Sequence, residues 1–262
     1  SIMKAVEHVP HETVLDLFAG SGRVAHAFHC LGSKVVANDY LVAAATVTQG
    51  LLSPQPEARY YEEMAKASPV PMNHWWCDAA EGYITRENAA AIGGMRLYVD
   101  TVPPEARAAL LGTLMVALGR VDACVGQYAA HLHGDSVPAR TKMDVRTLIE
   151  PLQHAPDMPA GKVACSEAQA LVDSLPDDFH VDLVYLDPPY TPTVNYPRYY
   201  HLLDTLVLFD APVTRGKTKK RPNTHEKSPW ISSKAHAVEE ALIKLMVGLQ
   251  GHTSHVLLSF SD

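Results

Sequence analysis

The chain has 262 residues, of which 47% are hydrophobic and 19% are charged. This length allows one catalytic domain with an inserted subdomain but no second full enzyme domain, and the composition excludes long disordered segments. No apolar run could span a membrane, no signal peptide is visible and no Cys pair has metal-ligand spacing, so we expect a cytoplasmic protein without a membrane or metal partner.

The first predicted elements are a strand, a turn, a helix and a second strand in succession. The first strand covers residues 13–18 (TVLDLF) and runs into a glycine turn at residues 19–22. A helix follows over residues 23–31, and the second strand, residues 34–37, is closed by the tripeptide NDY at 38–40. Because parallel strands need a crossover helix, this order predicts a Rossmann-like, doubly wound α/β sheet.

The character of the sequence changes at residue 52. Prolines interrupt the chain, and the segment at 103–119 (PPEARAALLGTLMVALG) starts with two prolines and is typical of a helix rich in Ala and Leu. We assign residues 52–158 to a mostly helical inserted subdomain that recognises the target. Residues 1–51 and 159–262 are assigned to the catalytic domain.

The α/β pattern resumes after the insertion with strands and helices in alternation. We predict a strand at 162–165, a helix at 166–174, a strand at 181–186, a helix at 235–249 and a strand at 255–260. The strand at 181–186 ends at the tetrapeptide DPPY, and a loop with proline and basic residues separates DPPY from the last helix. Open α/β sheets bind nucleotides at the carboxyl ends of their strands, which is where DPPY and the glycine turn fall.

The glycine turn and the second strand form a pattern suited to a nucleotide-like ligand. Residues 16–22 read D-x-F-x-G-x-G, in which glycines let the backbone approach a ligand closely. Asp39 ends the second strand, where a carboxylate can accept hydrogen bonds from both hydroxyls of a ribose. Dehydrogenases and purely structural turns share such a glycine turn, and Asp39 would also suit a helix N-cap.

The tetrapeptide DPPY has the groups needed to activate an aromatic amine. The exocyclic amine of adenine is a poor nucleophile because its lone pair is delocalised into the ring. The carboxylate of Asp187 and the carbonyl of Pro188 can each accept one N–H, which directs the lone pair outward and stabilises the charge that grows during attack. Pro189 helps to fix the backbone, and Tyr190 can stack on a base rotated out of the duplex. The alternative is a rigid Pro-Pro turn with an aromatic corner.

The segments DLFAGSGRVA, NDY and LDPPY together resemble the DPPY-type adenine-specific DNA methyltransferases in which the cofactor motif precedes a target-recognition insertion and the catalytic motif follows it. The resemblance covers residues 13–52 and about 162–262. It implies transfer of the methyl group of S-adenosyl-L-methionine to N6 of an adenine in double-stranded DNA. A further family element, an aromatic-Gly-x-Lys segment upstream of the glycine turn, is not recognisable, and we expect it to lie before Ser1.

The same resemblance implies roles for individual residues. The donor would contact Asp16, Phe18, Ala19, Gly20 and Gly22 at its methionine end, Asp39 at its ribose, and Ser166 or Glu167 at its adenine ring. Three further residues, Ser21, Asn38 and Tyr40, are also predicted to bind the cofactor. The catalytic residues would be Asp187, Pro188, Pro189 and Tyr190. The family usually has Asp at the adenine position, where this chain reads CSEA, so the choice between Ser166 and Glu167 stays open.

The segment NYPRYY at 195–200 and a nearby basic cluster offer aromatic stacking beside cations, which a flipped base and its flanking phosphates would need. The predicted nucleic-acid contacts are Tyr196, Tyr199, Arg215, Lys217, Lys219, Lys220 and Arg221. This local positive charge offsets a formal net charge of −7, which disfavours nucleic-acid binding. The alternative is a solvated loop with a few core tyrosines.

Two other functions fit parts of the sequence. Some rRNA adenine methyltransferases resemble both the glycine turn and the DPPY turn, but the 171 positions from Asp16 to Asp187 favour an insertion that recognises a duplex. A non-catalytic DNA-binding subunit with the same fold would suit the net acidity. For the enzyme, a restriction or phage-defence protein is the protein partner that we consider.

Overall fold

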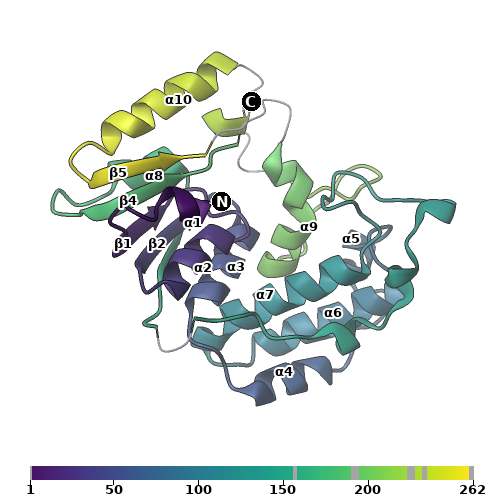
Figure 1. The fold of residues 1–262 in the computed structure, drawn as a ribbon. Coiled ribbons are helices and arrows are strands. Elements are labelled where there is room, and N and C mark those ends of the chain that lie inside the picture. Colours follow the sequence, from purple (N-terminus) through teal and green to yellow (C-terminus); the bar gives the residue numbers. More distant parts are fainter. Residues whose placement is uncertain (1, 156–157, 190–194, 223–227, 232–234, 260–262) are drawn as a thin grey trace. The chain divides into compact units, whose positions relative to one another are not determined.

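The computed structural model describes residues 2–155, 158–189, 195–222, 228–231 and 235–259. Internal contacts divide the chain into two compact units (Figure 1). The first unit contains residues 1–54, 154–195 and 225–262, and the second contains residues 55–153 and 196–224. Residues 196–224, which the sequence pattern assigns to the catalytic domain, instead make their contacts with the insertion.

The first unit is built on one sheet of five parallel strands in the order β3-β2-β1-β4-β5 (Figure 1). The strands are β1 (Thr13–Asp16), β2 (Lys34–Asp39), β3 (Lys162–Cys165), β4 (Val181–Leu186) and β5 (Thr253–Leu258). All but one of the β4 side chains are buried, as expected for a central strand covered on both faces. The all-parallel sheet confirms the predicted Rossmann-like fold.

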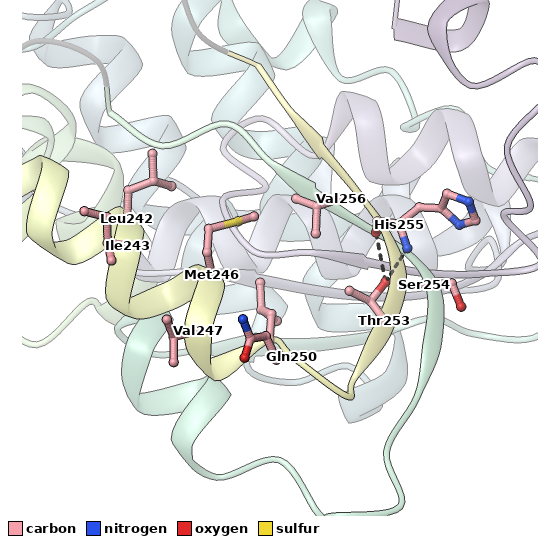
Figure 2. Close-up of a pocket in the computed structure, with 10 residues that line it drawn as sticks. Leu242, Ile243, Met246, Val247, Gln250, Thr253, Ser254, His255 and Val256 are labelled. Carbon is pink, nitrogen blue, oxygen red and sulfur yellow. Dashed lines mark hydrogen bonds between the residues drawn. The ribbon is translucent and has the colours of Figure 1, made fainter.

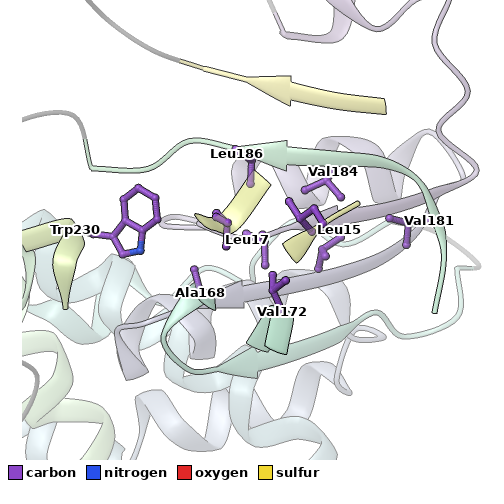
Figure 3. Packing of buried hydrophobic residues seen from close by; sticks show 10 residues of the cluster. Leu15, Leu17, Ala168, Val172, Val181, Val184, Leu186 and Trp230 are labelled. Atoms are coloured by element: carbon purple, nitrogen blue, oxygen red, sulfur yellow. The ribbon is translucent and has the colours of Figure 1, made fainter. Parts of the chain in front are cut away.

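Helices pack against both faces of this sheet. They are α1 (Ile2–Ala5), α2 (Arg23–Cys30), α3 (Val42–Leu52), α8 (Ala168–Asp173), the 3-10 turn η4 (Pro229–Ile231) and α10 (Ala235–Gly248). Val14 of β1 belongs to an apolar core with Phe28 of α2. The next residue, Leu15, belongs to a second core with Val172 of α8 and Trp230 of η4 (Figure 3). Successive strand side chains point to opposite faces, so β1 anchors two cores at once.

The second unit is mostly helical. Its helices are α4 (Ala58–Ala65), α5 (Trp75–Ala79), α6 (Arg86–Val99), α7 (Pro104–Val121) and α9 (Tyr196–Leu208), with 3-10 turns η1 (Gly134–Ser136), η2 (Ala139–Lys142) and η3 (Val145–Leu148). Pro104 opens α7, as the sequence predicts. In the part of the chain that the structure describes, no helix has the length and apolar character needed to cross a membrane.

Helix α9 occupies part of the segment that the sequence analysis predicted as a loop, so that prediction was wrong. Pro197 lies in the first turn, where a helix tolerates proline. Leu202 and Leu206 are one turn apart and both are buried. Arg96 of α6 donates from Nε to the Leu206 carbonyl and from Nη2 to the Val207 carbonyl, each at 2.9 Å, and thereby satisfies the C-terminal end of α9.

A pocket of about 460 Å³ lies along α10 and the edge strand β5 of the first unit (Figure 2). Its lining is largely apolar and includes Ile243 and Val247, whose side chains are 59% and 58% exposed. None of the predicted site residues lines this pocket. It is therefore separate from the candidate active site.

The packing of the glycine turn generates the first prediction. Gly22 has a φ of 73°, and a Cβ there would lie 2.8 Å from Thr48 Oγ1 and 3.0 Å from Leu51 Cδ1. We expect Gly22→Ala to lower the free energy of unfolding by about 2–4 kcal/mol, since steric overlap adds to backbone strain.

Gly32→Ala is the matched control for this prediction. Gly32 also has a positive φ, 95°, but a Cβ there would meet nothing within 4 Å. Only the backbone strain applies, so we expect a loss of about 1–2 kcal/mol. Denaturant titration measures both values, and equal losses would refute the role of packing against α3.

Candidate active site

The parallel strands bring the predicted motifs to one edge of the sheet. Asp16 of β1 is in register with Ala37 of β2 and Tyr185 of β4, two residues before Asp39 and Asp187. The chain passes from β1 to β2 on one side and from β4 to β5 on the other, so the winding of the sheet reverses between β1 and β4. Open α/β sheets bind ligands at such a reversal point.

The glycine turn wraps the end of β1 and leaves part of its backbone open. The Ala19 amide donates to the Asn38 carbonyl at 2.9 Å, and the Gly22 amide donates to the Ala19 carbonyl at 2.8 Å. Gly20 and Gly22 have φ values of 54° and 73°, which glycine adopts without strain. Ala19 and Gly22 are buried, whereas Gly20 and Ser21 are exposed and accessible to a ligand.

Asp39 connects the second strand to the glycine turn. Its Oδ2 accepts the Gly20 amide at 2.7 Å, and its Oδ1 accepts the Leu41 amide at 2.8 Å. Burial raises the pKa of Asp39, and these backbone bonds oppose that rise. Each carboxylate oxygen has a second lone pair, so Asp39 can still accept hydroxyl groups.

Asn38 uses its side chain within the fold. The buried amide donates from Nδ2 to the carbonyls of Leu17 and Ser166, both at 3.1 Å, and its Oδ1 accepts the Ser166 amide at 3.2 Å. These bonds hold the loops after β1 and β3 together. The geometry supports a positioning role for Asn38, beside the half-buried Tyr40.

Asp16 is the most deeply buried acid of the site. Its exposed fraction is 0%, its Oδ1 accepts the Phe18 amide at 3.3 Å, and its Oδ2 is buried without a hydrogen-bond partner among the described residues. Burial, together with the nearby charges of Asp39 and Asp187, raises the pKa of Asp16 to about 8. A buried polar atom normally has a partner, so Asp16 fits a ligand that brings positive charge or an N–H donor.

Asp187 follows β4 directly and faces the same region. Its Oδ1 is buried and has no partner in the described part of the chain. Burial raises the pKa of Asp187, whereas the hydroxyl-bearing neighbours Ser259 and Tyr185 lower it. Pro188 is buried and Pro189 is half-buried. Tyr190, the fourth predicted catalytic residue, lies outside the described residues.

Trp230 is a site residue that the sequence analysis missed. Its indole Nε1 donates to Glu167 Oε1 at 3.0 Å, and its ring meets Phe18 edge-on at a centroid distance of 5.0 Å. Glu167 also caps α8, because its Oε2 accepts the Ala170 amide at 3.1 Å. Trp230 therefore fixes two predicted donor contacts, Phe18 and Glu167. An isolated tryptophan beside a basic loop was the available signal.

The predicted nucleic-acid contacts lie in the second unit. Tyr196 and Tyr199 are on α9, where Tyr196 stacks on Tyr200 with ring centroids 6.1 Å apart. The basic residues form a tight turn, residues 215–221, which we call the basic turn. Arg215 and Lys220 exchange both backbone hydrogen bonds across it, at 2.8 and 2.9 Å.

Only some of the cations in the basic turn are paired. Lys219 Nζ lies 3.5 Å from Glu81 Oε2. Arg221 donates two hydrogen bonds to the Asp210 carboxylate, from Nη1 at 3.1 Å and from Nη2 at 2.8 Å. The guanidinium of Arg221 lowers the pKa of Asp210. Within the described ranges, no ion pair involves Arg215, Lys217 or Lys220.

Comparisons with known proteins point to one family. A family model described as D12 class N6 adenine-specific DNA methyltransferase matches residues 2–247. Modification methylase LlaI from Lactococcus lactis subsp. lactis is 26% identical over 96% of this chain. Type II methyltransferases M.FokI from Planomicrobium okeanokoites and M.NlaIII from Neisseria lactamica are 30% and 26% identical over 69% and 87%.

The relatives are longer than the matched chain. The match covers 42% of LlaI, 27% of M.FokI and 70% of M.NlaIII, so the chain spans less than half the length of the first two. No solved structure was found to match.

The pKa of Asp16 predicts how stability depends on pH. Folded Asp16 keeps its proton up to about pH 8, whereas the unfolded chain releases it near pH 4, so Asp16 makes the folded state less stable as pH rises between these values. Asp16→Asn cannot ionise and keeps an oxygen for the Phe18 amide. We expect the stability of Asp16→Asn, relative to the unsubstituted protein, to rise by about 1 kcal/mol per pH unit between pH 5 and 7.

Denaturant titrations of both proteins at pH 5, 6 and 7 measure this difference. Other titrating groups are common to the two proteins and largely cancel. A difference that stays constant across this range would show that Asp16 is already ionised in the folded protein.

Proposed function

Because the chain belongs to the D12 class of N6 adenine-specific DNA methyltransferases, we propose that it transfers the methyl group of S-adenosyl-L-methionine to N6 of adenine in double-stranded DNA. The observation that carries this proposal is a pair of carboxyl groups at adjacent strand ends, the buried Asp16 and the half-buried Asp187. Each has one oxygen without a partner among the described residues. The Asp16 oxygen suits a cationic methyl donor, and the Asp187 oxygen suits an amine that donates an N–H.

The residues at the sheet edge fit the chemical groups of the donor. S-adenosyl-L-methionine carries an ammonium group, two ribose hydroxyls and a sulfonium that makes its methyl group electrophilic. The unpartnered Oδ2 of Asp16 can accept from the ammonium, and the spare lone pairs of Asp39 can accept from the hydroxyls. Phe18, with Trp230 packed against it, gives an apolar wall. A cationic ligand is favoured here because its charge stabilises the ionised form of Asp16, whose proton is otherwise retained up to about pH 8.

The adenine ring of the donor would be bound beyond β3. Ser166 and Glu167 follow that strand, and both are already bonded within the fold, Ser166 to Asn38 and Glu167 to Trp230. These bonds fix the edge against which a purine can rest, and they favour a positioning role for Asn38. The exposed backbone at Gly20 allows the close approach that the methionine end requires.

Asp187 and Pro188 would bind the amine that is methylated. The free Oδ1 of Asp187 accepts one N–H of the adenine amine, and the Pro188 carbonyl accepts the other. These two acceptors turn the nitrogen lone pair toward the methyl group. The carboxylate also stabilises the positive charge that grows on the nitrogen during attack. The target base must leave the duplex to reach this site, and Tyr190 is proposed to stack on it.

The basic turn and α9 are proposed to contact DNA. Arg215, Lys217 and Lys220 would bind phosphates, and Tyr196 and Tyr199 would stack on bases or pack against the sugars. The names of the relatives, modification methylase and type II methyltransferase, support a role in a restriction-modification system. A restriction endonuclease with the same target sequence is then the protein partner, and the cytoplasm is the proposed location.

Methyl transfer to duplex DNA is the direct test of this function. Incubation with a methyl-labelled donor should place the label on N6 of adenine, which mass spectrometry of digested DNA identifies. Asp187→Ala should reduce turnover by at least about a hundredfold, because it removes an acceptor on which the transition state depends, while donor affinity changes little.

Asp173→Ala serves as a control for this test, since Asp173 is an exposed carboxylate on α8 of the same unit. It should methylate DNA at the unsubstituted rate. Donor binding without any N6-methyladenine would refute the proposed activity. Retained turnover in Asp187→Ala would refute the mechanism.

Donor binding should release a proton. Free Asp16 holds its proton up to about pH 8, and a bound cation favours the ionised form. We therefore expect donor affinity to rise between pH 6 and 7.5, by up to about tenfold per pH unit, and the rise to vanish in Asp16→Asn. Calorimetry in buffers of different ionisation enthalpy measures the proton directly. Affinity independent of pH would rule out Asp16 as the ammonium acceptor.

A further inference from the structure

The middle of the basic turn is bonded to a buried tyrosine from a distant part of the second unit. The side chain of Tyr83 is fully buried, and its hydroxyl lies within hydrogen-bond distance of two carbonyl oxygens, that of Thr218 at 2.6 Å and that of Tyr128 at 2.7 Å. The hydroxyl has one proton, which it donates to one of these carbonyls at a time. Thr218 lies between Arg215 and Lys220, the two residues whose backbones pair across the turn. The Tyr83 hydroxyl therefore connects the helical insertion to the centre of the basic turn.

A neutral histidine on α9 completes this contact. His201 Nε2 lies 3.2 Å from the Tyr83 hydroxyl and 3.1 Å from the Tyr128 carbonyl. Burial, assisted by the charges of Lys220 and Arg221 and opposed by the hydrogen bond to the Tyr128 carbonyl, lowers the pKa of His201 to about 4, so the ring is neutral at physiological pH. Its Nδ1 is without a partner in the described residues, which favours the tautomer with the proton on Nε2. His201 can then donate while Tyr83 donates to Thr218.

The turn is also fixed from outside by two ion pairs. Lys219 pairs with Glu81, two residues before Tyr83, and Arg221 pairs with Asp210 at the end of α9. These acids neutralise two of the five cations. The remaining three, Arg215, Lys217 and Lys220, have no ion pair in the part of the chain that is described. The turn thus combines a hydrogen-bonded backbone with two exposed cations, Arg215 and Lys217, and a half-buried one, Lys220.

We infer that Tyr83 is a positioning residue for DNA binding, which acts by holding the basic turn so that Arg215, Lys217 and Lys220 present their charges together to the phosphate backbone. A turn that is already ordered loses less conformational entropy on binding than a mobile one. The inference rests on the proposed function, because it takes the basic turn as a phosphate-binding element.

The test is a thermodynamic cycle between Tyr83 and the three available cations. Tyr83→Phe keeps the ring and removes the hydroxyl. We expect it to weaken duplex DNA binding and to raise the KM for DNA by roughly three- to tenfold, the scale of one lost hydrogen bond. The kcat at saturating DNA and the donor affinity should not change. Hydrogen exchange of the turn amides should become faster.

The second arm removes the cations. Arg215, Lys217 and Lys220 are replaced together by Ala, which should weaken DNA binding and reduce the slope of log affinity against log salt by up to about 2.7. If Tyr83 acts through these cations, Tyr83→Phe should have no further effect on DNA affinity in this triple variant. A role in general stability would instead give the same loss in both backgrounds.

Tyr61→Phe is the matched control, because Tyr61 is a buried tyrosine of the same unit whose hydroxyl has no partner among the described residues. It should leave DNA affinity unchanged. Should Tyr83→Phe not fold, His201→Phe removes the group that hydrogen-bonds to the Tyr83 hydroxyl, and the same results are expected of it.

The outcomes separate this inference from the proposed function. If the unsubstituted protein does not methylate DNA, the proposed function fails. If the triple variant binds DNA as well as the unsubstituted protein, the DNA role of the turn and of Tyr83 both fail. If the triple variant binds weakly but Tyr83→Phe binds normally, or loses the same factor in both backgrounds, only the inference about Tyr83 is overturned.

Discussion

The burial of carboxyl groups at the end of a parallel sheet is the constraint on which the candidate site depends. Asp16, Asp39 and Asp187 follow one another across neighbouring strands, and each has its pKa raised by loss of water. Isolated carboxylates in such surroundings destabilise a fold. The two apolar cores on either side of β1 offset that cost, and a cationic donor would remove it. The proposed preference for a positively charged ligand follows from the same geometry.

The loops of the candidate site are held in place by residues that do not themselves have to contact a ligand. Asn38 ties the loop after β1 to the loop after β3, and Trp230 holds Phe18 and Glu167 from behind. Such supporting contacts decide whether charged groups stay within the narrow geometry that catalysis requires. They also explain why buried polar side chains are tolerated here, since Asn38 and Glu167 are bonded through both of their terminal polar atoms.

The second unit resolves the apparent conflict between a net charge of −7 and the proposed DNA substrate. Charge acts locally, because salt screens exposed groups beyond about 8–10 Å. Glu81 and Asp210 neutralise two cations of the basic turn and fix its backbone, so these acids support the positive surface. The cations that have no such ion pair keep their charge for a partner. The overall balance of acidic and basic residues is therefore a poor guide to what this surface binds.

Local sequence determined the elements and motifs of the first unit. Apolar runs such as VDLVYL at 181–186 are typical of buried strands, and Gly20 and Gly22 adopt a turn that other residues enter with strain. Helix α9 and Trp230 were missed because both are stabilised by residues far along the chain. Arg96 hydrogen-bonds to the C-terminal end of α9, and Phe18 packs against Trp230.

The tertiary structure alone decided which groups meet. Hydrogen bonds between residues more than a hundred positions apart, such as Tyr83 to Thr218 and Asn38 to Ser166, leave no periodic trace in a sequence. The same holds for burial, which gave Asp16 a pKa far from that of an exposed carboxyl. Motif order reveals that Asp16 and Asp187 belong to one edge, but only the folded chain shows that each keeps an oxygen without a partner there. Sequence specifies residue types and local periods, whereas hydrogen bonding and desolvation depend on distances that packing sets.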